Sequence, residues 1–471
     1  MSRINTNIPS LIAARVFAQQ NERLNQSLER LSTGLRINRG KDDPAGLIAS
    51  ERLRTDIRAI GAAISNARRA DNIISTAEGA LNEVGNLIVE IEDLVDRSAN
   101  EAGLSTDEVN ANQLQIDSIL DSINRIANST AFAGNKLLNG NFDYSLSSVT
   151  AADLAAVTVN TARIADGGTR TVVVDVTTSA QTAQLNNTAS GVAAGAVSLE
   201  IGGNLGTEQF TFVGSTTNAN IAAAVNAAKD LTGVSASLSG SALRFNSTSY
   251  GSDQFVSVST ISGTFAVTGG TGGRDTGIDV VANINGQSVT GVGLDLKLNT
   301  ASLSVDITLA SAFAQQTAST STFGVTGGGA TFSLAPELGL VGRQSIGLAS
   351  ITTGNLGKTG VGFLSTLGSG QTNALNQKNF LTSQRLIREA STKVASLRGR
   401  LGSFQKDTIA STISSLQIAL ENTKAAESLI RDTDFATETS NLTRAQILVA
   451  ASTSTLGLAN TAPQSVLALL G

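Results

Sequence analysis

The sequence contains no cysteine, no histidine and no tryptophan, and only one methionine among 471 residues. Without thiolates or imidazoles the chain cannot form a disulfide, a Ser-His-Asp or Cys-His nucleophile, or a zinc site of the usual ligands. Aromatic residues make up 4% of the chain, and the net charge is −5. So few aromatic residues argue against one wide core, and the negative charge offers no basic surface for nucleic acid. We therefore expect no enzyme, no cofactor, no metal site and no nucleic-acid partner.

The first residues also lack the unbroken apolar segment and the small-residue cleavage site of a secretory signal peptide. No run of 18 or more apolar residues occurs anywhere in the chain, so we expect no membrane insertion. The protein is expected to be cytoplasmic, or to leave the cell by a route that does not read a Sec signal.

Glycine and charge are distributed unevenly along the chain. Residues 151–370 hold 33 of the 46 glycines but only 20 of the charged residues. Alternating polar and apolar residues in this region predict strands, for example at Thr171–Val176, Val197–Ile201, Phe255–Val258 and Leu303–Ile307. One helix is expected near Asn218–Asp230, between the strand pair Leu199–Phe212 and the pair Val234–Phe245.

The N-terminal part has the spacing of long helices. Apolar residues share one face at Phe17, Leu24, Leu28, Leu31 and Leu35. The segment Asn38–Pro44 breaks this helix, and Asp43 and Pro44 suit the cap and first position of another. From there Leu53, Ile57, Ile60 and Ile64 follow the 4-3 repeat of a coiled coil, which predicts a helix from about 45 to 99. Ser105–Asp107 predicts the cap of a further helix that ends near Asn128.

The C-terminal part repeats this pattern. Leu397, Leu401 and Phe404 lie on one face, and after a slip of one residue Ile409, Ile413 and Leu416 resume it. The last stretch, 433–471, is rich in alanine, serine, threonine and leucine, with Ile447, Leu448, Val466 and Leu467 among its apolar residues. A narrow apolar stripe must meet another stripe, so we expect the N- and C-terminal stripes to pack against each other.

These patterns predict a mainly α fold with an inserted β-rich region. The expected division has five segments: 1–44 and 433–471 as helices of an inner layer, 45–145 and 372–432 as the two parts of a helical rod, and 146–371 as one or more outer domains.

The terminal helices pose a burial problem. Their stripes are thin, so an isolated pair buries too little apolar area to offset the entropy lost on ordering. We hypothesise that they fold on polymerisation. An ordinary monomeric hairpin coiled coil remains the alternative.

Long motifs at both ends resemble bacterial flagellin, over about 140 residues at one end and 90 at the other. The motifs are Ile4–Asn7, Leu28–Asn38, Lys41–Gly46, Ser98–Asn100 and Phe132–Leu138, with Asp434–Glu438, Ser440–Ile447, Leu458–Asn460 and Pro463–Leu467. In addition, Phe210–Ile221 and Ala282–Gly286 are similar to a repeat module found in some flagellins and filament-cap proteins.

The resemblance implies a subunit that polymerises into the extracellular flagellar filament. It implies terminal helices that are disordered in the monomer and form an inner coiled-coil layer on assembly. Expected partners are identical subunits, an export chaperone, the type III export apparatus, the filament cap and the hook-junction proteins. The assembly core would contain Leu24, Leu28, Leu31, Leu35, Ile447, Leu448, Val466 and Leu467. The rod would be packed by Leu53, Ile57, Ile60, Ile64, Leu397, Leu401 and Phe404.

Two alternatives stay open beside the filament subunit. One is a hook–filament junction protein of the same superfamily, against which the complete Lys41–Gly46 and Ser440–Ile447 motifs speak. The other is an adhesin or signalling coiled coil, which would need no specialised C-terminus such as Pro463–Leu470.

The resemblance also points to a surface read by the Toll-like flagellin receptor. In detected flagellins, the helix before the Ser98–Asn100 motif carries two arginines, a leucine and a glutamine. The corresponding positions here are Glu90, Glu92, Leu94 and Arg97. Because glutamates, Glu90 and Glu92, replace the two arginines of detected flagellins, we expect weak or absent receptor activation.

Overall fold

The computed structural model describes residues 6–100, 103–165, 167–187, 189, 191–192, 195–337, 339–340 and 342–468, with the backbone alone for 462–468. The chain divides into two compact units. The first, here called the terminal unit, comprises Met1–Arg69, Leu334–Glu337 and Asp407–Gly471; the central unit comprises Ala70–Ser333 and Leu338–Lys406. Among the described residues, no helix combines the length and apolarity needed to cross a membrane.

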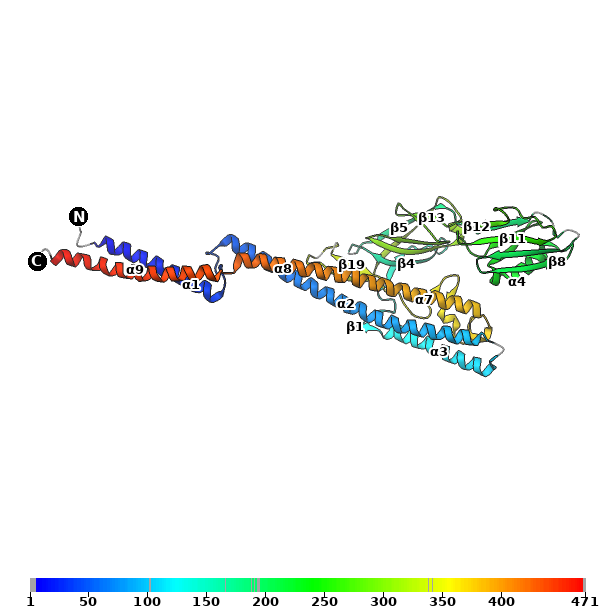
Figure 1. Cartoon of the computed structure of the whole chain (residues 1–471), viewed down its shortest axis with the longest axis horizontal. Coiled ribbons are helices and arrows are strands. Elements are labelled where there is room, and N and C mark those ends of the chain that lie inside the picture. The colour runs from blue at the N-terminus through cyan, green and yellow to red at the C-terminus, as the bar shows by residue number, and fades with distance from the viewer. Residues whose placement is uncertain are drawn as a thin grey trace. The chain divides into compact units, whose positions relative to one another are not determined.

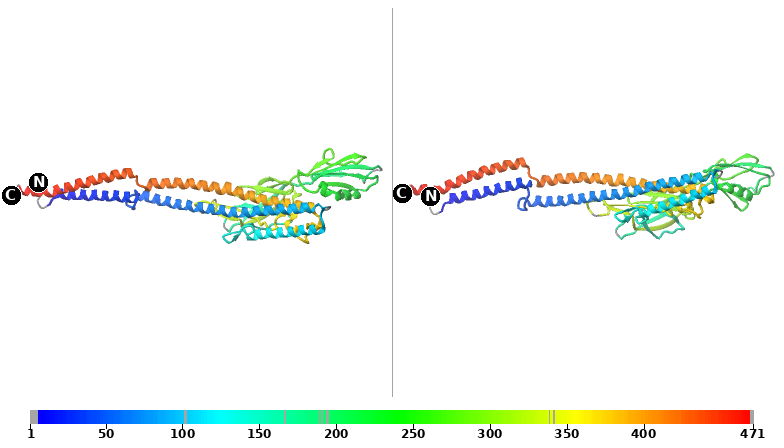
Figure 2. Two further views of the ribbon diagram at one scale, coloured as in Figure 1. Left: turned by 60° about the horizontal axis from the view of Figure 1, so that its bottom comes forward. Right: turned by 90° about the horizontal axis from the view of Figure 1, so that it is seen from below.

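The terminal unit is helical and contains α1 (Ile8–Thr33), the start of α2 (Pro44–Ser98), α8 (Ser411–Arg431) and α9 (Phe435–Ala468). Helices α1 and α9 run side by side in opposite directions (Figures 1 and 2). At one end of the pair the Asn7 side chain donates a hydrogen bond to the Ala459 carbonyl (2.7 Å). At the other end Leu35 forms an isolated β-bridge with Asp432. Helices α1 and α9 therefore pack against each other, although part of their predicted apolar stripes stays exposed.

A glycine ends α1 earlier than its apolar spacing predicts. Gly34 adopts a left-handed conformation (φ 73°), and its N–H bonds to the Arg30 carbonyl, which is a common way to end a helix. Our placement of Leu35 on the helical face was wrong, since Leu35 lies beyond this cap.

The long helices of the central unit are the rest of α2, α3 (Thr106–Ser129) and α7 (Phe380–Ser403). The predicted cap of α3 is confirmed, because Ser105 and Glu108 form a reciprocal capping box. Helix α3 lies beside α2, where Gln115 donates to Glu90 (3.2 Å).

A π-helical segment, η4 (Phe404–Ala410), joins α7 to α8. A π-helix bonds residues five apart instead of four, so it accommodates one extra residue. This explains the slip of one residue between Phe404 and Ile409 in the apolar repeat. In the central unit, the Gln405 amide holds η4 against α2 by donating to the Asp71 carboxylate (3.0 Å) and the Ser75 hydroxyl (2.8 Å).

The β-rich part of the central unit contains two apolar cores. The first lies between an antiparallel five-stranded sheet in the order β14-β13-β5-β17-β3 and a three-stranded sheet β15-β16-β4. Strand β16 illustrates how this core is built. Every second side chain of the strand is buried in it, namely Leu303, Val305, Ile307 and Leu309. The strands are β3 (Tyr144–Ser147), β4 (Leu154–Ala162), β5 (Arg170–Thr178), β13 (Val281–Ile284), β14 (Gln287–Thr290), β15 (Asp295–Asn299), β16 (Leu303–Leu309) and β17 (Ser319–Gly328).

The second core lies between the sheets β12-β11-β7-β8 and β6-β10-β9 and is completed by helix α4. The elements are β6 (Gln184–Asn187), β7 (Val197–Gly203), β8 (Thr207–Phe212), α4 (Asn218–Ala227), α5 (Lys229–Thr232), β9 (Val234–Ser239), β10 (Ala242–Ser247), β11 (Phe255–Ser262) and β12 (Arg274–Thr276). The predicted strand, helix, strand order of this region is confirmed, and so is the mainly α fold with a β-rich insertion.

Short elements complete the central unit. They are β1 (Ala131–Phe132), β2 (Asn135–Lys136), α6 (Ser311–Ala314), β18 (Ala330–Ser333), β19 (Arg343–Ile346), β20 (Gly357–Lys358), β21 (Gly362–Phe363) and the 3-10 turns η2 (Leu364–Leu367) and η3 (Leu375–Gln377).

Candidate assembly interface

Among the described side chains, few are fully buried between α1 and α9, and all but one of these are small. On α1 the buried side chains are Ala13 and Ser27; on α9 they are Glu438, Ala445 and Ser452. The α9 residues follow one another at intervals of seven, and the α1 residues are fourteen apart, so each set keeps one heptad position. Small side chains let the backbones approach closely but remove little apolar area from water, at about 25 cal/mol per Å².

The large apolar side chains of the same helices remain exposed. Leu11 and Ile447 are 65% and 64% exposed. The exposed set is Ile8, Leu11, Ile12, Val16 and Leu28 on α1, with Phe435, Ile447, Leu448 and Leu458 on α9. Large hydrophobic residues therefore lie on the outside of this pair, which marks an interaction surface.

An apolar groove of about 390 Å³ lies between the two helices near their free ends. It is lined by Pro9, Ile12, Ala13 and Val16 from α1, and by Ser452, Thr455 and Ala459 from α9. The groove exists because small α9 residues face larger α1 residues along this stretch.

Of the residues assigned to the assembly core by the resemblance, Leu28, Ile447 and Leu448 are exposed, whereas Leu24, Leu31 and Leu35 are half-buried. The side chains of Val466 and Leu467 lie outside the described residues. Sequence reasoning missed the small-residue contact, although its heptad spacing is readable once small residues are scored like apolar ones.

Charged groups position α9. Arg30 of α1 forms an ion pair with Glu438 (3.6 Å), whose side chain is 8% exposed. Asp434 accepts hydrogen bonds from the N–H groups of Ala436 and Thr437, and these bonds lower the pKa of the Asp434 carboxyl below its usual value. The carboxylate thus caps the start of α9.

The turn between α1 and α2 is held by backbone and side-chain bonds. The Arg36 N–H donates to the Arg431 carbonyl (2.7 Å), and its guanidinium donates to the Ile430 carbonyl (2.6 Å). Ile37 is buried within the turn. Asp43 accepts from the Gly46 N–H (2.9 Å), so the predicted cap of α2 is confirmed, with Pro44 as its first residue.

We expect Asp43→Ala to lower the free energy of unfolding by about 1 kcal/mol, because the first turn of α2 loses its cap. Asp43→Asn is the matched control, since an amide oxygen still accepts the bond. Chemical denaturation followed by circular dichroism measures both variants. Equal losses for Ala and Asn would contradict a capping role.

The residues assigned to rod packing fall into both units. In the terminal unit Ile60 and Ile64 pack with Leu416, while Leu53 and Ile57 are half-buried. In the central unit Leu397 and Leu401 are buried. Phe404 contacts Phe332 at a ring-centroid distance of 6.0 Å, so this ring meets the β-rich region.

The four positions of the receptor comparison are not equally accessible. Glu90 and Arg97 are exposed, and Arg97 pairs with Asp93 (2.6 Å). Glu92 lies 3.9 Å from Arg388. Leu94, the one residue that is kept, is buried.

Both ends of the chain match known protein-family regions. Residues 4–143 match the bacterial flagellin N-terminal helical region, and residues 384–470 match the bacterial flagellin C-terminal helical region. Residues 198–249 match the flagellin hook IN motif, which contains the Phe210–Ile221 part of the predicted module. Flagellin D of Vibrio anguillarum is 31% identical over 471 residues, which cover 99% of each chain. The chain belongs to the bacterial flagellin family.

Other flagellins are similar over different lengths. Flagellin C of Vibrio cholerae is 30% identical across 99% of each chain. Flagellin E of the same species is 48% identical over 139 residues, and this alignment spans 30% of the present chain and 36% of Flagellin E. Flagellins are structural proteins, which agrees with the role that the resemblance implies.

Among solved structures, the flagellar cap protein FliD D2-D3 domains from Serratia marcescens are 21% identical, with a TM-score of 0.26, over 36% of this chain and 98% of that one. Xanthomonas campestris FlgL is 16% identical, with a TM-score of 0.27, over 80% of this chain and 99% of that one. TM-scores this low support no functional statement beside the flagellin match.

Proposed function

We propose that this chain is a structural subunit that polymerises into the flagellar filament through its terminal helices. One observation carries the proposal: among the described side chains, α1 and α9 fully bury five, four of them small, and leave nine large apolar ones exposed. Full burial of one such side chain contributes roughly 1.5–3 kcal/mol. Identical neighbours that cover these faces supply the burial that the pair lacks.

The assembly reaction couples ordering to association. Ordering a backbone costs about 1–2 kcal/mol per residue, and the α1–α9 contact gives little apolar burial in return. Stacking against other subunits adds burial on the outer faces, so α1 and α9 become stable within the polymer. The residues assigned to the assembly core, including Val466 and Leu467, belong to this inner layer. Residues 1–44 and 433–471 form the inner layer of the filament, 45–145 and 372–432 form the helical rod, and 146–371 forms the outer domains.

The partners outside the polymer follow from the family. An export chaperone covers the apolar α9 before secretion, and the chain leaves through the type III export apparatus. It then assembles beneath the filament cap, on the hook-junction proteins, outside the cell. The exposed apolar face of α9 supports the need for such a cover.

Negative-stain electron microscopy of the purified full chain after salt-induced polymerisation tests the proposal. We expect long helical filaments. Short aggregates without helical order, or a chain that stays monomeric under seeding, would contradict a filament subunit and leave a junction protein as the better assignment.

The reversed charges at Glu90 and Glu92 lead to a separate expectation. The wild type activates a Toll-like flagellin receptor reporter cell weakly or not at all, because these carboxylates oppose a surface built for arginine. The double variant Glu90→Arg/Glu92→Arg increases the response, whereas the control Asp56→Arg does not. A wild-type dose response equal to that of an enteric flagellin would contradict this.

A further inference from the structure

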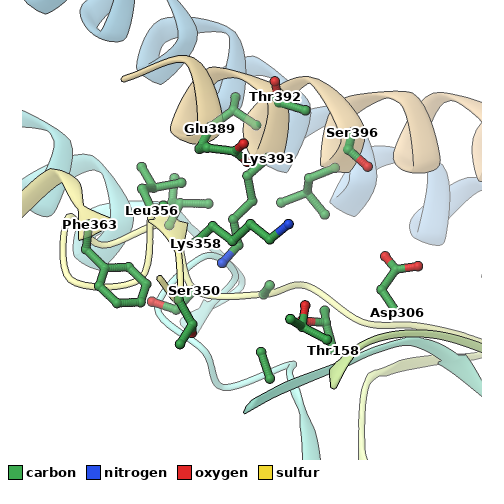
Figure 3. Close-up of a pocket in the computed structure, with 18 of the residues that line it drawn as sticks. Thr158, Asp306, Ser350, Leu356, Lys358, Phe363, Glu389, Thr392, Lys393 and Ser396 are labelled. Carbon is green, nitrogen blue, oxygen red and sulfur yellow. The ribbon is translucent and has the colours of Figure 1, made fainter. Parts of the chain in front are cut away.

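The central unit contains a cavity of about 250 Å³ between helix α7 and strands β4 and β16. Its walls combine polar and apolar side chains, which come from α7, from the two strands and from residues 349–363. In Figure 3 the amino groups of Lys358 and Lys393 and the carboxylate of Asp306 are directed into this space. A cavity of this size and polarity holds a small molecule or several waters.

Two polar atoms at the cavity have no hydrogen-bond partner among the described residues. One is the Asn160 side-chain oxygen, an acceptor on a residue that is 5% exposed. The other is Nε of Arg400, a donor. Leaving a buried polar group unpaired costs about 1–3 kcal/mol. The cavity therefore presents one unmatched acceptor and one unmatched donor.

Positive and negative side chains both surround the cavity, but most of them do not form ion pairs with one another. Lys358 forms an ion pair with Asp295 (2.5 Å). In the part of the chain that the structure describes, no ion pair within 4.0 Å involves Lys393, Arg400, Asp306 or Glu389. The Lys393 ammonium donates only to the Asn355 carbonyl (2.7 Å). Two cations on α7 thus remain without a directly contacting carboxylate.

Burial makes this arrangement unfavourable without a ligand. It lowers the pKa of Lys393 and of Arg400, and the negative charges of Asp143 and Asp306 offset this only in part. At the opposite wall Asp306 accepts from the Asn160 amide nitrogen (3.1 Å), so the acceptor oxygens of Asn160 and Asp306 lie together. Lys393 and Arg400 lie on α7, where Glu389 also lines the cavity, and Asn160 and Asp306 lie on the strands.

We propose that this cavity binds a small zwitterion, a free α-amino acid whose carboxylate faces Lys393 and Arg400 and whose ammonium group faces Asn160 and Asp306. A zwitterion matches the balanced charge, gives the Arg400 donor an acceptor and gives the Asn160 acceptor a donor. An anion alone would leave Asn160 and Asp306 unmatched, and a cation alone would leave Arg400 unmatched. The bound molecule links α7 to the sheet.

Calorimetric titration of the unassembled full chain with glycine, L-alanine and L-serine tests this site independently of filament formation. We expect saturable binding of at least one amino acid at one site per chain. Acetate and methylammonium, which each carry half of the zwitterion, bind at least tenfold more weakly. Arg400→Gln weakens amino-acid binding at least tenfold, whereas Arg388→Gln, which removes an exposed charge from the same helix, leaves it unchanged.

A second variant tests the site if Arg400→Gln does not fold. Ser396→Phe adds bulk at the cavity wall without removing a charge, and it abolishes binding. The proposal is overturned if none of the three amino acids gives saturable heat with the wild type, if acetate alone binds as tightly as they do, or if folded Arg400→Gln retains the wild-type affinity.

Discussion

A chain that ends at residue 432 forms no filaments, although its central unit still folds. The deletion removes α9 and with it the partner of α1, so the small-residue contact and the exposed apolar face of α9 are both lost. The two cores of the β-rich region contain no residue beyond Val325, so they remain intact. Because assembly depends on α1 and α9 together, we expect complete loss of polymerisation.

Electron microscopy after salt-induced polymerisation, with and without wild-type seeds, measures this effect. Circular dichroism of the β-rich region serves as the folding control. Filaments of normal length and number from the truncated chain would show that α9 is dispensable and would contradict the proposed assembly surface.

A single charge on the exposed face of α9 weakens polymerisation without abolishing it. Ile447→Asp places a carboxylate where a neighbour should bury an apolar side chain, which removes about 1.5–3 kcal/mol of burial per contact. This corresponds to a rise of roughly tenfold or more in the critical concentration for polymerisation. The monomer is affected little, because Ile447 is 64% exposed there and surface substitutions usually change stability within about 0.5 kcal/mol.

Thr453→Asp is the matched control for Ile447→Asp. Thr453 is also exposed on α9 and gains the same charge, but it loses no large apolar side chain. Sedimentation of polymer at a series of protein concentrations gives the critical concentration of each variant. Equal critical concentrations for the two variants would mean that added charge, rather than lost burial, controls assembly.

The sequence predicts the helices of this fold well, because their signals are local. A helix expected from about 45 to 99 is α2, Pro44–Ser98, and the predicted cap at Ser105 is present. Even the slip after Phe404 has a physical cause in the π-helical segment. Leu35 was misplaced because the expectation gave the heptad spacing more weight than the glycine that ends α1.

Contacts between residues that are far apart in the chain could not be predicted from the sequence. The ring contact of Phe404 with Phe332 depends on the placement of the β-rich region, which no local periodicity encodes. The cavity beside α7 combines residues from β4, β16 and residues 349–363, and its charged side chains look like ordinary surface residues in the sequence. The β-strands were predictable individually from alternation, but their order in each sheet was not.

Hydrogen exchange of α1 and α9, compared between monomer and filament, tests most directly whether these helices need identical neighbours. Amides of residues 8–33 and 435–461 should exchange close to the rate of an unfolded chain in the monomer, while the cores of the central unit stay protected. In the filament the same amides should become strongly protected. Full protection of both helices in the dilute monomer would contradict the account, because the pair would then be stable without assembly.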